Sequence, residues 1–115
     1  MLEITTEFRK GVLFVRLSGE LTKQTVDKLN KEVTSLIKDN GIRNIVFNIK
    51  DLNMIDIKGI NALLYNYELS KANNGKVCVC GIKNPLVSQR IRNSRLLKYM
   101  YESSDELGAF NIINL

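Results

Sequence analysis

The sequence lacks histidine and tryptophan and holds only one proline and two cysteines, Cys78 and Cys80. Without histidine the chain cannot form a His-based catalytic triad or offer an imidazole as a general base or metal ligand. The cysteines are too few for a four-ligand Cys/His zinc site, and thiols one residue apart in a strand project from the same face in poor disulfide geometry. We therefore expect reduced core cysteines, no catalytic residues, no metal and no cofactor, in a protein that is not an enzyme.

Long apolar segments are also missing. No run approaches the ~20 residues that cross a bilayer, and the chain does not open with a basic stretch followed by an apolar one, so we expect neither a membrane span nor a signal peptide. The expected location is cytoplasmic. Hydrophobic residues make up 44% of the sequence and the net charge is +5, which excludes a disordered chain. The length fits one domain over residues 1–115.

Strand-like and helix-like patterns alternate along the chain. Residues 2–8 and 12–18 flank Gly11 and predict a hairpin. An amphipathic helix is then expected from Lys23, with Thr22 placed to cap its start and Gly41 following its end. The later expected elements are a strand over 42–49, a polar turn over 50–53, a helix from near Asp56 ended by residues 73–75, a strand over 77–81, a helix over 86–92, a strand over 99–101 and a helix opened by a capping box at Ser103 and Glu106. This β-β-α-β-α-β-α-β-α order predicts a single α/β domain with a mostly parallel mixed sheet, an antiparallel N-terminal edge strand and about four helices.

The loop before the second long helix is the main candidate site. In sheets of this kind, binding sites form at the carboxyl ends of strands, where loops enter helix N-termini. Asp56 stands where an N-cap belongs, and its simplest role is a capping carboxylate worth about 1 kcal/mol. Capping is compatible with a second role in binding.

Several segments resemble motifs of one family. Leu17–Leu21, Asn48–Leu52 and Met54–Ile60 are similar, in this order, to L-x-G-E-L-D, N-L-x-D-L and M-D-S-S-G-L of the STAS domains of bacterial anti-sigma factor antagonists. Cys78–Gly81 and the helix after Pro85 fall where the family places its last parallel strand and third helix. The resemblance covers essentially the whole chain and implies a STAS-like fold.

The resemblance also implies a function. Family members bind a serine-kinase-type anti-sigma factor, which uses ATP, and so release a sigma factor for transcription; phosphorylation of the second serine of D-S-S-G breaks the complex. Ile57 and Lys58 stand at the serine positions here, and Thr22 replaces the aspartate of G-E-L-D. Lysine has no hydroxyl, so the usual switch cannot operate at residue 58, and a cation at a helix N-terminus is mildly unfavourable.

Three roles remain open for Lys58. It is a solvated lysine on a partner face that has diverged, or it contacts an acidic partner directly and gives binding that a kinase cannot reverse, or regulation lies on another hydroxyl, with Ser18, Thr22 and Thr25 the nearest candidates. Helical spacing places Tyr65 and Leu69 on an exposed stripe, unless both lean over the core edge. The partner-binding residues implied by the resemblance and this stripe are Asp56, Ile57, Lys58, Gly59, Asn61 and Tyr65, with Leu21, Thr22 and Thr25 contributing.

The segment from Lys71 to Lys98 contains seven basic residues and no Asp or Glu. No aromatic residue is interleaved, so a solvated basic face, or one matched to an acidic protein, is favoured over nucleic acid. Beside the antagonist, two other functions stay open: a STAS module of a sensory complex or transporter outside sigma control, and a nucleotide- or small-ligand-binding protein, for which no phosphate-binding Gly-rich loop is present. We expect no direct nucleic-acid contact, no membrane insertion, and a monomer or weak dimer.

Overall fold

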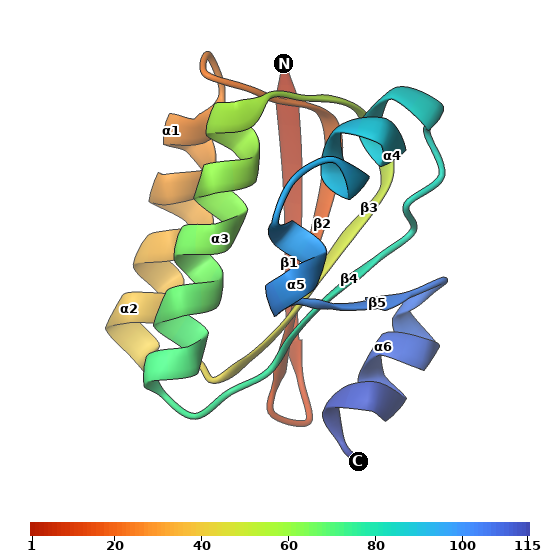
Figure 1. The fold of residues 1–115 in the computed structure, drawn as a ribbon. Coiled ribbons are helices and arrows are strands. Elements are labelled where there is room, and N and C mark those ends of the chain that lie inside the picture. The colour runs from red at the N-terminus through yellow and green to blue at the C-terminus, as the bar shows by residue number, and fades with distance from the viewer.

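A five-stranded sheet forms the centre of the molecule (Figure 1). In the computed structural model, which describes residues 1–115, the strands follow one another across the sheet in chain order. They are Leu2–Arg9 (β1), Val12–Leu21 (β2), Asn44–Ile55 (β3), Val77–Cys80 (β4) and Tyr101–Ser103 (β5). β1 runs antiparallel to β2, and all other neighbours are parallel. The predicted fold class, a mixed α/β sheet with an antiparallel edge strand, is confirmed.

Helices cover the two faces of this sheet unequally. They are α1 (Val26–Leu29), η1 (Asn30–Thr34), α2 (Ser35–Asn40), α3 (Ile57–Ala72), α4 (Pro85–Arg92), α5 (Leu96–Tyr99) and α6 (Glu106–Ile113). On the first face, α1 to α5 bury a core of 22 residues, whereas on the second face α6 alone covers a cluster of 7 (Figure 1). Part of the second face is therefore left open.

The first long helix begins later than its apolar pattern predicts. Its N-cap residue is Thr25, and η1 forms a π-helical turn between α1 and α2. The prediction that Thr22 caps the helix is wrong, because Thr22 closes the preceding turn: its N–H donates to Thr25 Oγ1 at 2.9 Å, and that hydroxyl donates to the Glu20 carbonyl at 2.8 Å. Gly41 ends the helix with φ near +60°, as predicted.

β3 continues through the segment that its polar residues mark as a turn. Residues 50–53 remain in the strand because β2 also extends beyond Ser18, to Leu21, and pairs with them. Leu52 and Ile55 point into the large core and are almost fully buried. A polar composition does not end a strand when a neighbouring strand satisfies its backbone and the core takes its apolar side chains.

The C-terminal elements also differ from their prediction. Residues 96–99 form α5, and the strand expected at 99–101 lies at 101–103. The cap of α6 is Asp105, whose carboxylate accepts the Gly108 N–H at 2.8 Å, so the capping box predicted at Ser103 is wrong. Ser103 is the last residue of β5, and its hydroxyl donates to the carbonyl of Asp105 at 3.0 Å.

Both cysteines lie in β4 and face the small core beside α6. They are free and buried, as predicted. Burial raises the pKa of Cys78 to about 11 and that of Cys80 to about 12, so both are neutral thiols near pH 7. No helix combines the length and the hydrophobicity needed to span a bilayer.

Candidate functional site

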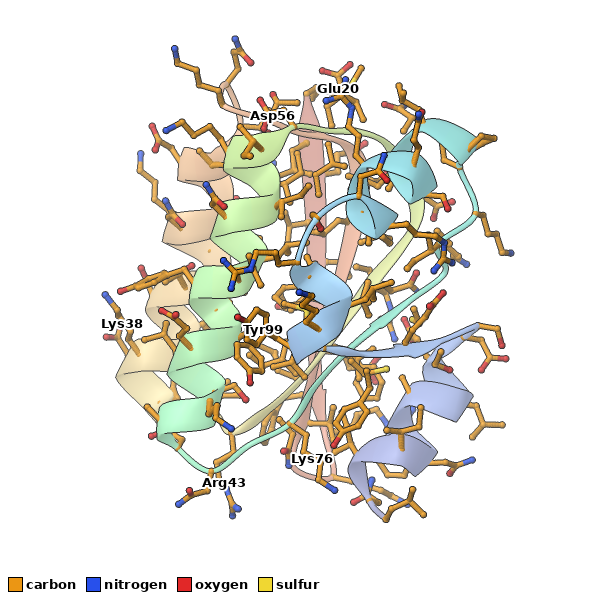
Figure 2. The ribbon with its side chains drawn as sticks, in the orientation of Figure 1. Glu20, Lys38, Arg43, Asp56, Lys76 and Tyr99 are labelled. Atoms are coloured by element: carbon orange, nitrogen blue, oxygen red, sulfur yellow. The ribbon has the colours of Figure 1, made fainter.

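The N-terminus of α3 is fixed to the neighbouring loop through Asp56. One carboxylate oxygen accepts the Gly59 N–H at 2.9 Å, which is the predicted N-cap, and the other accepts the Lys23 N–H at 2.9 Å. Burial by itself raises the pKa of Asp56, but these backbone donors outweigh it and lower the pKa below its usual value. Figure 2 shows Asp56 and Glu20 at the same end of the molecule. A charged Asp56 therefore holds the loop before α1 against the start of α3.

Gly59 lets this helix approach β2 closely. A Cβ atom at this position would lie 2.2 Å from the carbonyl oxygen of Leu21, a backbone atom that cannot swing away. The same carbonyl accepts the Asp56 N–H at 3.3 Å. The end of β2 and the first turn of α3 are thus packed backbone against backbone, which makes the exposed surface above them rigid.

Four of the predicted partner-binding residues form an exposed strip along α3, which we call the α3 surface: Ile57, Lys58, Asn61 and Tyr65. Ile57 is 69% exposed and Tyr65 is 43% exposed. The Lys58 ammonium makes no ion pair, and the Lys38 Nζ lies 5.3 Å from the centre of the Tyr65 ring. Leu69 packs instead against the large core. An apolar side chain, a free cation and an aromatic ring thus stand together on one rigid helix.

The other predicted residues lie beneath this surface. Leu21, Thr22 and Gly59 are buried, and Thr25 is half-buried. Leu21 and Thr22, which are predicted to contribute to partner binding, do not present their side chains to solvent: the core takes the apolar side chain, and the Thr22 hydroxyl donates to Gln24 Oε1 at 3.1 Å. These residues shape the α3 surface from below. Of the alternative hydroxyls, Ser18 lies on the second face of the sheet, in the hollow described next.

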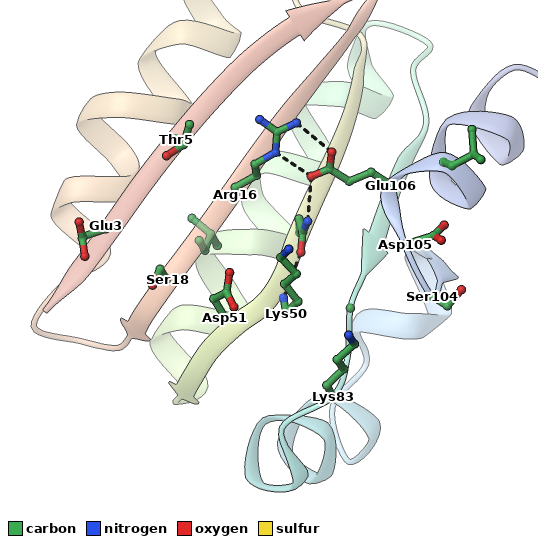
Figure 3. Close-up of a pocket in the computed structure, with 14 residues that line it drawn as sticks. Glu3, Thr5, Arg16, Ser18, Lys50, Asp51, Lys83, Ser104, Asp105 and Glu106 are labelled. Carbon is green, nitrogen blue, oxygen red and sulfur yellow. Dashed lines mark hydrogen bonds and ion pairs between the residues drawn. The ribbon is translucent and has the colours of Figure 1, made fainter.

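A polar hollow of about 750 Å³ occupies the open part of the second face (Figure 3). At its centre Arg16 binds Glu106 through two hydrogen bonds of 2.8 Å, and Arg16 Nη2 also donates to Glu7 at 3.0 Å. The amide of Asn48 donates to the same Glu106 carboxylate at 2.8 Å. The hydrogen bonds from Arg16, together with the weaker effect of the one from Asn48, overcome partial burial and lower the pKa of Glu106 to about 2.

The sequence analysis missed this cluster. The available signal is Arg16 itself, a charged residue within a strand whose other central residues are apolar. Its main partner lies 90 residues away in the chain, so no local pattern connects the two. Because every charged member of the central cluster has a partner, its polar groups are already satisfied within the fold.

Basic residues of the segment 71–98 lie beside aromatic side chains in the fold, although no aromatic residue stands between them in the sequence. Three lysines, Lys71, Lys76 and Lys98, border a groove of about 290 Å³ together with Tyr67, Tyr99 and Tyr101. The rings of Tyr67 and Tyr99 pack with centroids 5.5 Å apart. The observation that no aromatic residue is interleaved holds for the sequence only, because the tyrosines come from outside the basic segment.

Of the remaining basic residues, Arg95 adjoins this groove, because its Nη2 donates to the Tyr99 hydroxyl at 3.2 Å, whereas two others are engaged elsewhere. Arg92 forms an ion pair with Glu102 at 2.8 Å, and Lys83 lines the polar hollow on the second face. The segment therefore has no single role as a unit.

The chain is similar to known proteins over nearly its whole length. Residues 3–108 match the STAS domain family. An anti-sigma F factor antagonist from Paenibacillus polymyxa is 34% identical over 108 residues, which cover 94% of this chain and 92% of the relative. The crystal structure of an anti-sigma factor antagonist from Mycobacterium paratuberculosis has a TM-score of 0.88 at 19% identity, covering 100% of this chain and 96% of that one. For the Bacillus cell fate determinant SpoIIAA in its phosphorylated form the TM-score is 0.73 at 19% identity, with 96% and 99% covered.

Proposed function

This chain belongs to the STAS domain family, and on that premise we propose that it is an anti-sigma factor antagonist that binds a serine-kinase-type anti-sigma factor and thereby releases a sigma factor for transcription. The observation that supports this most directly is the α3 surface, where the rigid, Asp56-capped first turn presents Ile57 and Lys58 to solvent. In this proposal the protein acts by occupying its partner, in the cytoplasm, and performs no catalysis itself.

Ile57 is the proposed apolar anchor of the interface. It is 69% exposed on a turn that the Asp56 and Gly59 contacts hold in place, so little conformational freedom is lost when a partner covers it. Burying a side chain of this size contributes about 1.5–3 kcal/mol. Tyr65, two turns further along the helix, extends the contact surface.

Lys58 makes the interaction insensitive to phosphorylation at this position. Its side chain has no hydroxyl, and its ammonium has no acidic partner within the protein. We propose that it pairs with an acidic group of the anti-sigma factor, which gives binding that the partner's kinase activity cannot reverse at this helix. Regulation through another hydroxyl, such as that of the half-buried residue Thr25, is the alternative.

The first experiment is purification of the tagged protein from its native lysate, with retained partners identified by mass spectrometry. Recovery of an ATP-binding anti-sigma kinase supports the proposal. Recovery of a sensory complex or a transporter without such a kinase contradicts it and supports the alternative, a STAS module outside sigma control, which the missing serine at residue 58 favours.

Substitutions then test the α3 surface with the purified partner. Ile57→Asp should weaken binding at least tenfold, whereas Leu107→Asp is a matched control, because Leu107 is 70% exposed in the first turn of α6. Lys58→Glu should weaken binding if the lysine meets an acidic surface, and an unchanged dissociation constant would exclude that contact. Lys58→Ser places a hydroxyl at the family's phosphorylation position. Phosphate incorporation at this serine by the partner kinase, detected by mass spectrometry, would show that the kinase can still act there and that the switch is absent only because the serine has been replaced.

A further inference from the structure

The outer edge of β1 is a row of backbone groups that no other strand pairs with. β1 pairs only with β2, in a register that places Leu2 opposite Gly19, and therefore Met1 opposite Glu20. The Glu20 N–H donates to the Met1 carbonyl at 2.9 Å, which makes Met1 and Glu20 a hydrogen-bonded pair. Because such pairs alternate along an antiparallel ladder, the odd-numbered residues of β1 face β2 and the even-numbered ones direct their N–H and C=O groups outward.

An independent contact supports this assignment. The Nζ of Lys28, on α1, donates to the carbonyl of Leu2 at 2.8 Å, which requires that carbonyl to point away from β2. Lys28 thereby closes the edge at Leu2. None of the hydrogen bonds outside the ladder reaches the outward backbone groups of Ile4, Thr6 or Phe8. An edge of this length that stays open is a template for another strand.

We propose that this edge pairs with the β1 strand of a second copy of the chain, antiparallel, about a two-fold axis through Thr6. The two five-stranded sheets then form one continuous sheet. Thr6 faces Thr6 of the second copy, and Ile4 faces Phe8 of the second copy. The outward N–H and C=O groups of Ile4, Thr6 and Phe8 all gain partners, because each of these pairs exchanges two hydrogen bonds.

The side chains are complementary in this register. On the first face, the half-buried Ile4 lies opposite Phe8, which is 59% exposed in the single chain. On the second face, Glu3 lies opposite Arg9 of the second copy, and both are exposed. Glu3 and Arg9 form a non-hydrogen-bonded pair, the kind in which opposing side chains come closest. The strand thus pairs apolar with apolar and acid with base.

Neighbouring registers are worse. An axis through Thr5 places Glu3 opposite Glu7 and requires the Leu2 carbonyl, which Lys28 already occupies. An axis through Glu7 places two Glu7 side chains against each other. Like charges directly opposite destabilise a strand pair. A shift by a single residue would exchange the two faces.

The two-fold arrangement also closes the assembly. Each copy has one β1 edge, so pairing consumes both edges and leaves none for a third chain. The α3 surface is formed by a different element, and the dimer proposal does not depend on its function.

The first test is the mass of the protein in solution, measured by sedimentation equilibrium over a concentration series. We expect association to twice the 13.1 kDa of one chain. Thr6→Pro removes one outward N–H and no bond to β2, so it should raise the dimer dissociation constant at least tenfold. The circular dichroism spectrum should stay the same, as should the thermal midpoint measured at a concentration where the parent is monomeric. Thr6→Val, which keeps the N–H, should behave as the parent does. A parent that stays monomeric, or a Thr6→Pro variant that dimerises equally, overturns the proposal.

The second test determines the register with disulfides. Thr5 and Glu7 of the second copy form a non-hydrogen-bonded pair with Cα atoms about 4.5 Å apart, a separation a disulfide can bridge. Thr5→Cys mixed with Glu7→Cys should give a cross-linked heterodimer, and neither variant alone should cross-link. Cross-linking of Thr5→Cys alone would move the axis to Thr5, cross-linking of Glu7→Cys alone would move it to Glu7, and either result contradicts the register. The buried native cysteines make the parent protein the control.

Discussion

Helices α3 and α6 have the same kind of N-cap, but their N-termini lie in different surroundings. Asp56 accepts the N–H of Gly59 at 2.9 Å, and Asp105 accepts the N–H of Gly108 at 2.8 Å. After Asp105 comes Glu106, which the sheet binds through Arg16 and Asn48. After Asp56 the next side chains stay in solvent. The cap decides where a helix begins, and the residues opposite it decide whether that end is closed by the fold or open to a partner.

The two glycines differ in what lies against them. A Cβ at Gly59 would meet a backbone oxygen of Leu21, whereas a Cβ at Gly108 would lie 2.3 Å from the hydroxyl of Ser103, the end of a short side chain that can rotate. The open helix end is therefore the more rigidly packed one. Rigidity beneath an exposed surface is suited to binding, since the surface is already ordered.

The largest expected effect breaks this packing. Gly59→Ala should lower the free energy of unfolding by about 3 kcal/mol, because the added methyl group cannot be accommodated without moving β2 from α3. Gly108→Ala, the matched control, should cost about 1 kcal/mol or less. Urea unfolding at pH 7 compares them, and equal losses would mean that the two helix ends do not differ in packing.

The next effect separates the closed end by its charge. Glu106→Gln should destabilise the protein by about 1.5–3 kcal/mol at neutral pH, because its bonds to Arg16 are charge-assisted. In the folded protein the pKa of Glu106 is lowered from 4.5 to about 2, so its contribution is complete above the unfolded-state pKa and is lost as the pH falls from there toward about 2.

The pH dependence provides the measurement. The parent should lose stability over this acidic range, and Glu106→Gln should lose less of it over the same range. Asp51→Asn is the control, since Asp51 lines the same hollow without forming an ion pair. Parallel pH profiles for the parent and Glu106→Gln would contradict the assignment.

A smaller difference is expected between the two caps. Asp56→Ala should cost about 2 kcal/mol and Asp105→Ala about 1 kcal/mol, because Asp56 also accepts the Lys23 N–H. Hydrogen exchange should show faster exchange at Lys23 in the Asp56 variant only. Asp56→Asn, which can still accept at the cap, should recover part of the loss. Unchanged exchange at Lys23 would show that the second bond contributes nothing.

The smallest stability effect is expected at the exposed positions. Ile57→Ser and Leu107→Ser should each change the free energy of unfolding by less than about 0.5 kcal/mol, because both side chains are largely in solvent. Only Ile57→Ser should weaken binding of the anti-sigma factor. Equal binding by both variants would remove the functional difference between the two helix ends.

The sequence by itself determined the features that depend on neighbouring residues. Asp56 as N-cap, Gly41 as the helix end and the hairpin turn at Gly11 follow from the conformations and hydrogen bonds these residues favour. The order of strands and helices, and with it the mixed sheet, follows from the hydrophobic periods. The replacement of both serines by Ile57 and Lys58 is likewise visible without a structure.

Only the tertiary structure decided the features that depend on distant residues. β3 continues to Ile55 because β2 lies beside it, Thr22 closes a turn instead of capping a helix, and Tyr67 meets Tyr99 across the basic segment. Arg16 and Glu106 find each other 90 residues apart. Local propensities are worth fractions of a kcal/mol per residue, and strand pairing, core burial and paired charges outweigh them.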